Sequence, residues 1–171
     1  MSWAWLLHEI HQFLIGLATR PGTAGVTKTL GSGYDRGADE EKQRENIVEF
    51  CRNQLGEKYV FGKEVTGKDS DEWDCSEYSE AAYRDAGVPL CDGAQAQYDF
   101  CKPVVDPLAG DLGFLWSDKR NMIGHVMVNS GAGTVVHAVG GRGVVEDPIE
   151  MWVTHPRWRG WRRHRDFIQE G

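Results

Sequence analysis

The chain has 171 residues, 40% of them apolar, which suits one domain with a sizeable core and at most a small appendage. The formal net charge of −7 argues against non-specific binding of nucleic acid by the whole chain. The four cysteines form no C-x-x-C pair, so their spacing indicates no metal site. They are Cys51, Cys75, Cys91 and Cys101.

An amphipathic helix is predicted over residues 3–17, where apolar residues recur at helical spacing. Polar residues interrupt this run, which is too short to span a bilayer. No basic segment precedes it and no good cleavage site follows, so we expect no signal peptide. A Gly- and Thr-rich connector follows at residues 20–38. We therefore divide the chain into residues 1–37, a helix with its connector, and residues 38–171, a folded domain.

Helices and short strands are expected in the folded domain. One helix is predicted from Asp39 to Leu55, with Gly56 ending it. A second helix begins at Cys75 and continues to Gly87. Strands and a final short helix follow, bounded by glycine-containing turns. They are the strands Leu112–Trp116, His125–Asn129, Thr134–Ala138 and Gly143–Glu146, a helix capped by Asp147-Pro148, and a closing strand within Trp158–Phe167.

The start of the second helix carries a candidate nucleophile. Asp74 followed by Glu77 is a capping-box pattern, with the Asp74 carboxylate accepting from the N–H of Ser76 or Glu77. Cys75 then occupies the first turn, where the helix dipole lowers the pKa of a thiol. The alternative is a buried structural thiol. If Cys75 is free, at least one other cysteine is also unpaired, which favours a reducing compartment.

Two histidines are candidates for the base and its orienting partner. If the hairpin turn is centred on Gly131, His125 and His137 become cross-strand partners on one face. One imidazole then takes the thiol proton while the other fixes its tautomer. A one-residue slip would separate them. The alternatives are ordinary buried histidines or a zinc site of Cys75, His125 and His137. No role is assigned to the remaining histidines, His8, His11, His155 and His164.

Several short motifs carry a family resemblance. They are Tyr59-Val60-Phe61-Gly62, Trp73-Asp74-Cys75-Ser76, Ala109-Gly110-Asp111-Leu112, Gly124-His125-Val126 and Val136-His137-Ala138. In this order and approximate spacing the chain resembles NlpC-type cell-wall cysteine peptidases and their p-sixty relatives, from about residue 47 to residue 151. The resemblance implies an α+β, papain-like fold, with helices packed on a small antiparallel β-sheet and the cysteine at a helix N-terminus facing the histidine hairpin.

The resemblance also implies an activity. It implies a cysteine peptidase without a cofactor that hydrolyses an amide bond of peptidoglycan stem peptides, most often the γ-D-glutamyl–diamino acid bond. Cys75 is similar to the nucleophile, His125 to the general base and acid, and His137 to the orienting third member.

Substrate contacts follow from the same resemblance. Tyr59 matches the tyrosine whose hydroxyl borders the catalytic centre. Asp74 and Ser76 match positions that hold the amine of the substrate's terminal L-alanine, although Asp74 can equally act only as a cap.

Three departures from the family pattern bear on specificity. Glu77-Tyr78 replaces Gly-Leu after the cysteine and serine. Gly62-Lys63 replaces the double glycine that follows the aromatic residue, so Lys63 is expected to place a cation at the mouth of the site. Pro89-Leu90-Cys91 replaces Leu-Pro-Arg.

Other functions stay open. A related thiol amidase would cut the N-acetylmuramoyl–L-alanine bond or a cross-bridge, and a structural tail component would use the fold for docking. The helix at residues 3–17 favours a phage lysin or tail-tip hydrolase, made in the cytoplasm and carried in the virion or released to the wall by a phage route. A bacterial enzyme that recycles muropeptides is the alternative. Expected partners are stem peptides and a phage tail or other protein, with no nucleic acid and no transmembrane segment.

A basic segment closes the chain. Residues 157–165 contain five arginines, which either contact anionic wall polymers or lie on a solvated edge strand.

Overall fold

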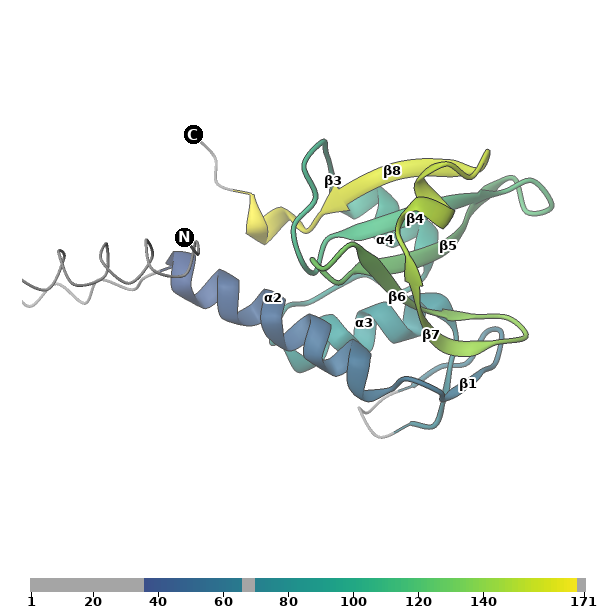
Figure 1. Ribbon diagram of the computed structural model, residues 1–171, viewed down its shortest axis with the longest axis horizontal. Coiled ribbons are helices and arrows are strands. Elements are labelled where there is room, and N and C mark those ends of the chain that lie inside the picture. The colour runs from purple at the N-terminus through teal and green to yellow at the C-terminus, as the bar shows by residue number, and fades with distance from the viewer. Residues whose placement is uncertain (1–35, 66–69, 169–171) are drawn as a thin grey trace, which may run out of the picture. The chain divides into compact units, whose positions relative to one another are not determined.

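A six-stranded antiparallel sheet carries the fold, with the strand order β3-β8-β4-β5-β6-β7 (Figure 1). This computed structural model describes residues 36–65 and 70–168, so the helix predicted at 3–17 lies outside the described residues. The strands are β3 (Lys102–Val104), β4 (Leu112–Ser117), β5 (Met122–Asn129), β6 (Thr134–Val139), β7 (Gly143–Pro148) and β8 (Trp158–Arg163). The predicted α+β architecture with an antiparallel sheet is confirmed.

Three helices pack against one face of this sheet: α2 (Arg36–Asn53), α3 (Cys75–Asp85) and α4 (Ala94–Phe100). Figure 1 shows α2 and α3 lying side by side under β6. Side chains of β5 and β6 enter the helical core in alternation, as the pleat of a strand requires, and both faces of the sheet contain buried residues. The core side chains from β5 and β6 are Val126, Val128, Val136 and Ala138. This packing sets the N-terminus of α3 against β5. In the described part of the chain, no helix is both long and apolar enough to cross a membrane.

The opposite face of the sheet carries a smaller aromatic cluster. Met127 and Val135 are buried there against Trp152 of α5 (Glu150–Val153) and against Trp158 and Trp161 of β8. Gly113 of β4 lets the two β8 indoles approach, because a Cβ at this position would lie 2.7 Å from the Trp158 ring and 2.8 Å from the Trp161 ring. The sheet is therefore covered on both faces beside the histidine hairpin.

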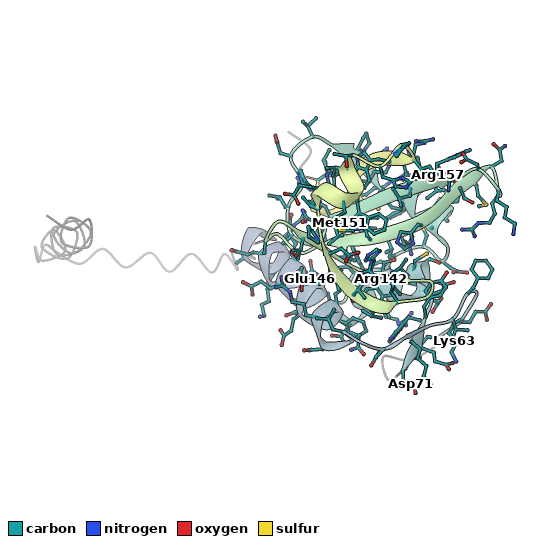
Figure 2. All side chains as sticks on the ribbon, turned by 45° about the vertical axis from the view of Figure 1, so that its right-hand side comes forward. Lys63, Asp71, Arg142, Glu146, Met151 and Arg157 are labelled. Carbon is teal, nitrogen blue, oxygen red and sulfur yellow. The ribbon has the colours of Figure 1, made fainter. Side chains whose placement is uncertain are left out.

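The basic C-terminal segment is part of the sheet rather than a solvated edge. Strand β8 lies between β3 and β4, so the edge-strand interpretation was wrong. Arg163 pairs with the fully buried Asp111 at 2.8 Å, and Arg162 lies 3.5 Å from the centre of the Tyr98 ring. Arg157, labelled in Figure 2, pairs with Asp118. These arginines bind the fold together.

Several element boundaries differ from the prediction. Helix α2 begins at Arg36 and ends at Asn53, and Gly56 instead donates its N–H to Val144 in β7. Helix α4 and strand β3 were not predicted, because seven and three residues are too few to display a period. A small parallel pair, β1 (Lys58–Tyr59) with β2 (Glu72–Trp73), was also not predicted. The closing strand ends at Arg163, before the 3-10 helix η1 (Arg165–Phe167).

Candidate active site

Asp74 caps helix α3 as the sequence predicts. Its Oδ1 accepts hydrogen bonds from the N–H groups of Ser76 and Glu77, both at 2.8 Å, and from the Ser76 hydroxyl at 3.0 Å. The second half of the predicted capping box does not form, because Glu77 Oε2 instead accepts from the Val65 N–H at 2.9 Å. Glu77 therefore anchors the loop before Asp74, and Cys75 is held at the first position of the helix.

A second helix secures the same turn. Gln97 of α4 is completely buried, and its Nε2 donates to the Ser76 carbonyl at 3.0 Å. Its Oε1 accepts from the Ser79 hydroxyl at 2.9 Å. Gln97 was not predicted as a site residue, since nothing near it in the chain indicates that it reaches α3. The turn that carries Cys75 is consequently fixed from two sides.

The Cys75 thiol is buried, and burial raises its pKa to about 11. The neighbouring Asp74 carboxylate raises this pKa further, while the backbone N–H groups of Val126 and of Cys75 itself, together with the Arg120 charge, lower it. The predicted lowering of the thiol pKa was therefore wrong, because loss of hydration outweighs the helix N-terminus. The sulfur is therefore a neutral thiol at neutral pH, and its predicted role as a nucleophile requires a base.

The two histidines meet on one face of the hairpin, although not in the predicted register. The pairs Val128↔Val136 and Asn129↔Val135 centre the turn on Ala132 rather than Gly131. His125 and His137 are therefore diagonal neighbours instead of direct partners. Because the shift moves the partner by two residues, both side chains stay on the same face. His125 Nε2 lies 2.7 Å from His137 Nδ1, which is the contact that the predicted roles of base and orienting partner require.

The hydrogen-bonded chain continues to a carboxylate. His137 Nε2 lies 3.1 Å from Asp147 Oδ2, and Arg142 holds both oxygens of that carboxylate at 2.8 and 2.6 Å. Arg142 is labelled in Figure 2. Asp147 was predicted to cap a helix, which was wrong: it lies in β7, and the N-cap of α5 is Ile149. Gly140-Gly141 was the missed signal, since a hairpin turn there places Asp147 on the same face as His137.

This chain fixes the tautomers of both imidazoles. The Arg142 guanidinium, and next the His137 hydrogen bond, lower the pKa of Asp147 to about 2, although burial opposes them. An ionised carboxylate only accepts, so His137 donates from Nε2 and accepts at Nδ1. His125 must then donate from Nε2. Nδ1 of His125 then carries no hydrogen, and its lone pair can accept a proton from Cys75.

Trp152 covers the histidine pair on its other side. Its ring centre lies 6.1 Å from that of His125 and 4.8 Å from that of His137. Burial, and next the neighbouring His137, lower the pKa of His125 to about 3. The pKa of His137 is also lowered by burial, although Asp147 opposes this. Both rings are therefore neutral at neutral pH, as a general base must be.

The pH dependence of activity follows from this burial. As the predicted general base, His125 accepts a proton only while neutral, so we expect activity to be retained as pH falls below 6.5 and to be lost only as pH approaches about 3. We expect the midpoint of the acidic limb of kcat/KM, measured from pH 3 to 8, to lie well below the usual imidazole pKa of 6.5. Trp152→Ala should admit water and move that limb upward. An acidic limb at 6.5 or higher in the unchanged protein would contradict the account.

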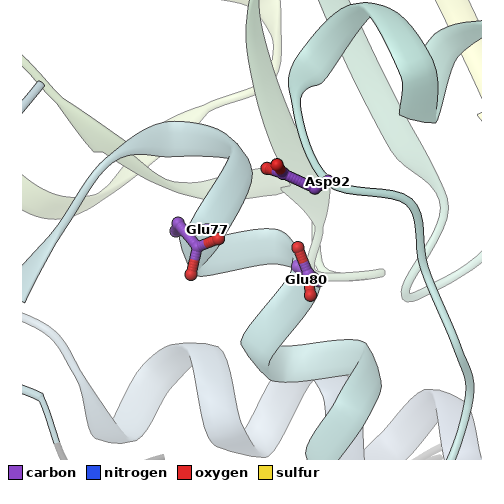
Figure 3. Close-up of side chains that lie close together, drawn as sticks. All are labelled: Glu77, Glu80 and Asp92. Atoms are coloured by element: carbon purple, nitrogen blue, oxygen red, sulfur yellow. The ribbon is translucent and has the colours of Figure 1, made fainter. Parts of the chain in front are cut away.

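Neither group of potential metal ligands is free to form a closed site. Both ring nitrogens of His137 are engaged, with His125 and with Asp147, so the zinc alternative does not fit the donor set. Among the described residues, one acidic group, Glu77, Glu80 and Asp92, is close enough to share an ion (Figure 3). Glu77 already accepts from Val65, and Glu80 pairs with Arg84. We assign this group no metal.

A cavity of about 410 Å³ opens beside the thiol. Cys75 and all three predicted substrate-contact residues, Tyr59, Asp74 and Ser76, line it. The expected cation, Lys63, labelled in Figure 2, is not among the lining residues, and it pairs with Glu72 at 3.1 Å. Arg120, between β4 and β5, lines the cavity instead.

The fold matches solved structures that share little sequence with this chain. NlpC1 of Trichomonas vaginalis has a TM-score of 0.61 at 23% identity, and the match covers 72% of this chain and 44% of that one. The peptidoglycan hydrolase RipB of Mycobacterium tuberculosis has a TM-score of 0.62 at 20% identity, with 92% and 79% covered. These likenesses confirm the predicted papain-like fold.

Sequence comparison gives the family. A probable endopeptidase of Corynebacterium glutamicum is 28% identical over 132 residues, which are 76% of this chain. The chain spans 59% of the length of that relative. The model of the NlpC/P60 family matches residues 56–163, which is more than half of the chain and contains Cys75, His125 and His137. The chain belongs to the NlpC/P60 family.

Proposed function

We propose that this protein is a cysteine peptidase that hydrolyses an amide bond in the stem peptides of peptidoglycan. The observation that carries the proposal is the hydrogen-bonded chain from Asp147 through His137 to His125, on strand β5, whose next residue, Val126, directs its backbone N–H to the Cys75 thiol at the start of α3. Membership of the NlpC/P60 family and the likeness to a peptidoglycan hydrolase support the substrate class.

The geometry supports nucleophilic attack by Cys75. Nδ1 of His125 takes the thiol proton as the sulfur attacks the amide carbonyl carbon. The carbonyl oxygen becomes an oxyanion, which the backbone N–H of Cys75 at the start of α3 stabilises in this proposal. The Asp147 carboxylate stabilises the imidazolium through His137.

Collapse of this intermediate releases the first product. His125 gives its proton to the departing amine, and the acyl group stays on the Cys75 sulfur as a thioester. His125 then takes a proton from water, whose oxygen attacks the thioester. The second collapse releases the carboxylic acid, and the sulfur regains its proton from His125.

We further propose that the bond cut is the γ-D-glutamyl–diamino acid bond. All hydrogen bonds of the Asp74 side chain within the described residues end on Oδ1, which leaves Oδ2 for the amine of a terminal L-alanine. Burial raises the pKa of Tyr59 to about 12, with further contributions from Cys75 and Asp74, so its hydroxyl stays protonated beside them. Ser76 holds the Asp74 carboxylate in place.

Mass spectrometry of digested sacculi and purified muropeptides tests this function. An endopeptidase releases fragments with a new diamino acid amine, whereas an amidase separates N-acetylmuramic acid from L-alanine. A cross-bridge cutter opens dimers without shortening the stems. Absence of any new terminus in all of these substrates would reject the proposed activity.

The helix predicted at residues 3–17 supports a phage-associated role, in which that segment binds a tail protein or another partner. Partner binding and catalysis would then lie in different parts of the chain, because the described site uses no residue before Tyr59. We expect deletion of residues 1–37 to leave muropeptide cleavage within about twofold of the full chain while removing partner binding, measured by pull-down from phage particles. A truncated protein that keeps its partner would contradict this role.

A further inference from the structure

Arg120 presents an exposed guanidinium to the catalytic cavity. Its Nη2 donates to the Gly124 carbonyl at 2.6 Å, and its Cζ lies 5.4 Å from the centre of the Phe61 ring. Within residues 36–65 and 70–168, Arg120 has no carboxylate partner, and no acceptor bonds its Nε or Nη1. Arg120 lines the cavity together with Cys75, so these donors are available to a substrate bound there.

The turn between β4 and β5 is shaped to hold this side chain. Arg120 donates its backbone N–H to the Ser117 carbonyl at 3.2 Å, and Asn121 takes a left-handed conformation with φ +53°. A Cβ at Gly124 would lie 2.4 Å from the Ser117 Cβ and 3.1 Å from Arg120 Nη2. Glycine at 124 therefore allows the turn to fold Arg120 back towards Cys75.

The charges that line the cavity are of both signs. Asp74, Asp92 and Asp99 are acidic, and Asp99 accepts from Gln95 at 3.0 Å. Asp92 lies with the acidic group shown in Figure 3. Arg120 is basic, and both Asp74 and Arg120 act on the pKa of Cys75, in opposite directions. The thiol is thus within electrostatic reach of an anion and a cation, which suits a substrate with an ammonium and a carboxylate.

We propose that Arg120 binds the free α-carboxylate of the γ-glutamyl residue whose side-chain carbonyl Cys75 attacks. This inference rests on the proposed function. A glutamyl residue linked through its γ-carboxyl keeps its α-carboxylate a few bonds from the carbon under attack. The planar guanidinium fork matches a carboxylate with two parallel hydrogen bonds. Amidation of that group, to isoglutamine, removes the charge and one acceptor oxygen.

Two synthetic peptides test this subsite on the full-length protein. Both contain L-alanine, a γ-linked D-glutamyl residue and a diamino acid, and one has its α-carboxylate converted to the amide. We expect the unchanged protein to cleave the carboxylate peptide with a kcat/KM about tenfold higher, the value of a charge-assisted hydrogen bond at an exposed site. Arg120→Gln should reduce this ratio to about one, mainly by raising the KM for the carboxylate peptide.

The ratio of the two kcat/KM values isolates the contact between Arg120 and the α-carboxylate from other effects of the substitution. A change in folding or in thiol reactivity alters both peptides alike and cancels. Arg159→Gln is the matched control, because Arg159 is also exposed but lies over Trp116 outside the cavity lining. It should keep the tenfold ratio.

The outcomes separate the subsite from the activity. A preference that persists in Arg120→Gln, or equal cleavage of both peptides by the unchanged protein, overturns the role of Arg120 and leaves the peptidase intact. Cleavage of neither peptide by the unchanged protein overturns the proposed γ-glutamyl bond, and the Arg120 subsite with it.

Discussion

Cys75→Ala is expected to lower the rate of muropeptide hydrolysis by at least about 10⁴-fold, because it removes the sulfur that forms the acyl intermediate in the proposed mechanism. The domain should stay folded, since alanine keeps the first helical position and the Asp74 cap does not involve the Cys75 side chain. Muropeptide release is measured by mass spectrometry, and folding by circular dichroism and thermal denaturation.

Cys101→Ala is the matched control for this prediction. Cys101 is also buried but does not line the cavity, so its replacement removes a similar buried sulfur without touching the reaction centre. It should cost about 1 kcal/mol of stability and leave the rate unchanged. Continued hydrolysis by Cys75→Ala, or its loss in Cys101→Ala, would reject Cys75 as the nucleophile.

Asp147→Ala is expected to lower kcat about a hundredfold with little change in KM. The substitution removes the acceptor that holds His137 Nε2–H, so His137 no longer fixes the donor nitrogen of His125 and the imidazolium loses its counter-charge. KM should hold because Asp147 does not line the cavity. Steady-state kinetics on a purified muropeptide would measure both constants.

Two further variants distinguish positioning from general destabilisation. Asp147→Asn keeps one oxygen that can accept from His137 and should recover part of kcat. Arg142→Ala should have a smaller effect, because the Arg142 side chain is 47% exposed and water can replace its contacts. Equal losses in all three variants, tracking only their thermal stability, would mean that Asp147 serves the fold alone.

The sequence predicts best those parts of the site that depend on neighbouring residues. The Asp74 cap and the position of Cys75 were correct because a cap is a local hydrogen-bond pattern. The shared face of His125 and His137 was also correct, since the alternation of a strand survives an even shift in register. Gln97 and Arg120 could not be found this way, because their contacts depend on how distant elements pack.

The pKa of Cys75 shows why local reasoning fails at a buried group. The helix start alone favours the thiolate, and the nearby N–H groups of Val126 and Cys75 do act in that direction. The dominant influence, loss of water, comes from the sheet and helices that close over the sulfur, which the chain around Asp74 does not reveal. Asp147 was missed for a related reason: the Asp-Pro dipeptide resembles a helix start, yet the longer hairpin β6–β7 determines its place.

The turn that joins β5 and β6 has a consequence for how this chain can vary. His125 and His137 share a face only while the number of residues between them keeps its parity. Removing one residue from the loop at 130–133 would turn His137 to the helical face and break the chain to Asp147. Removing two residues would keep His125 and His137 on the same face and would shift only the register between β5 and β6. Exposed loops ordinarily tolerate insertions and deletions. The length of this loop is nevertheless constrained, because it determines which face of the sheet His137 occupies.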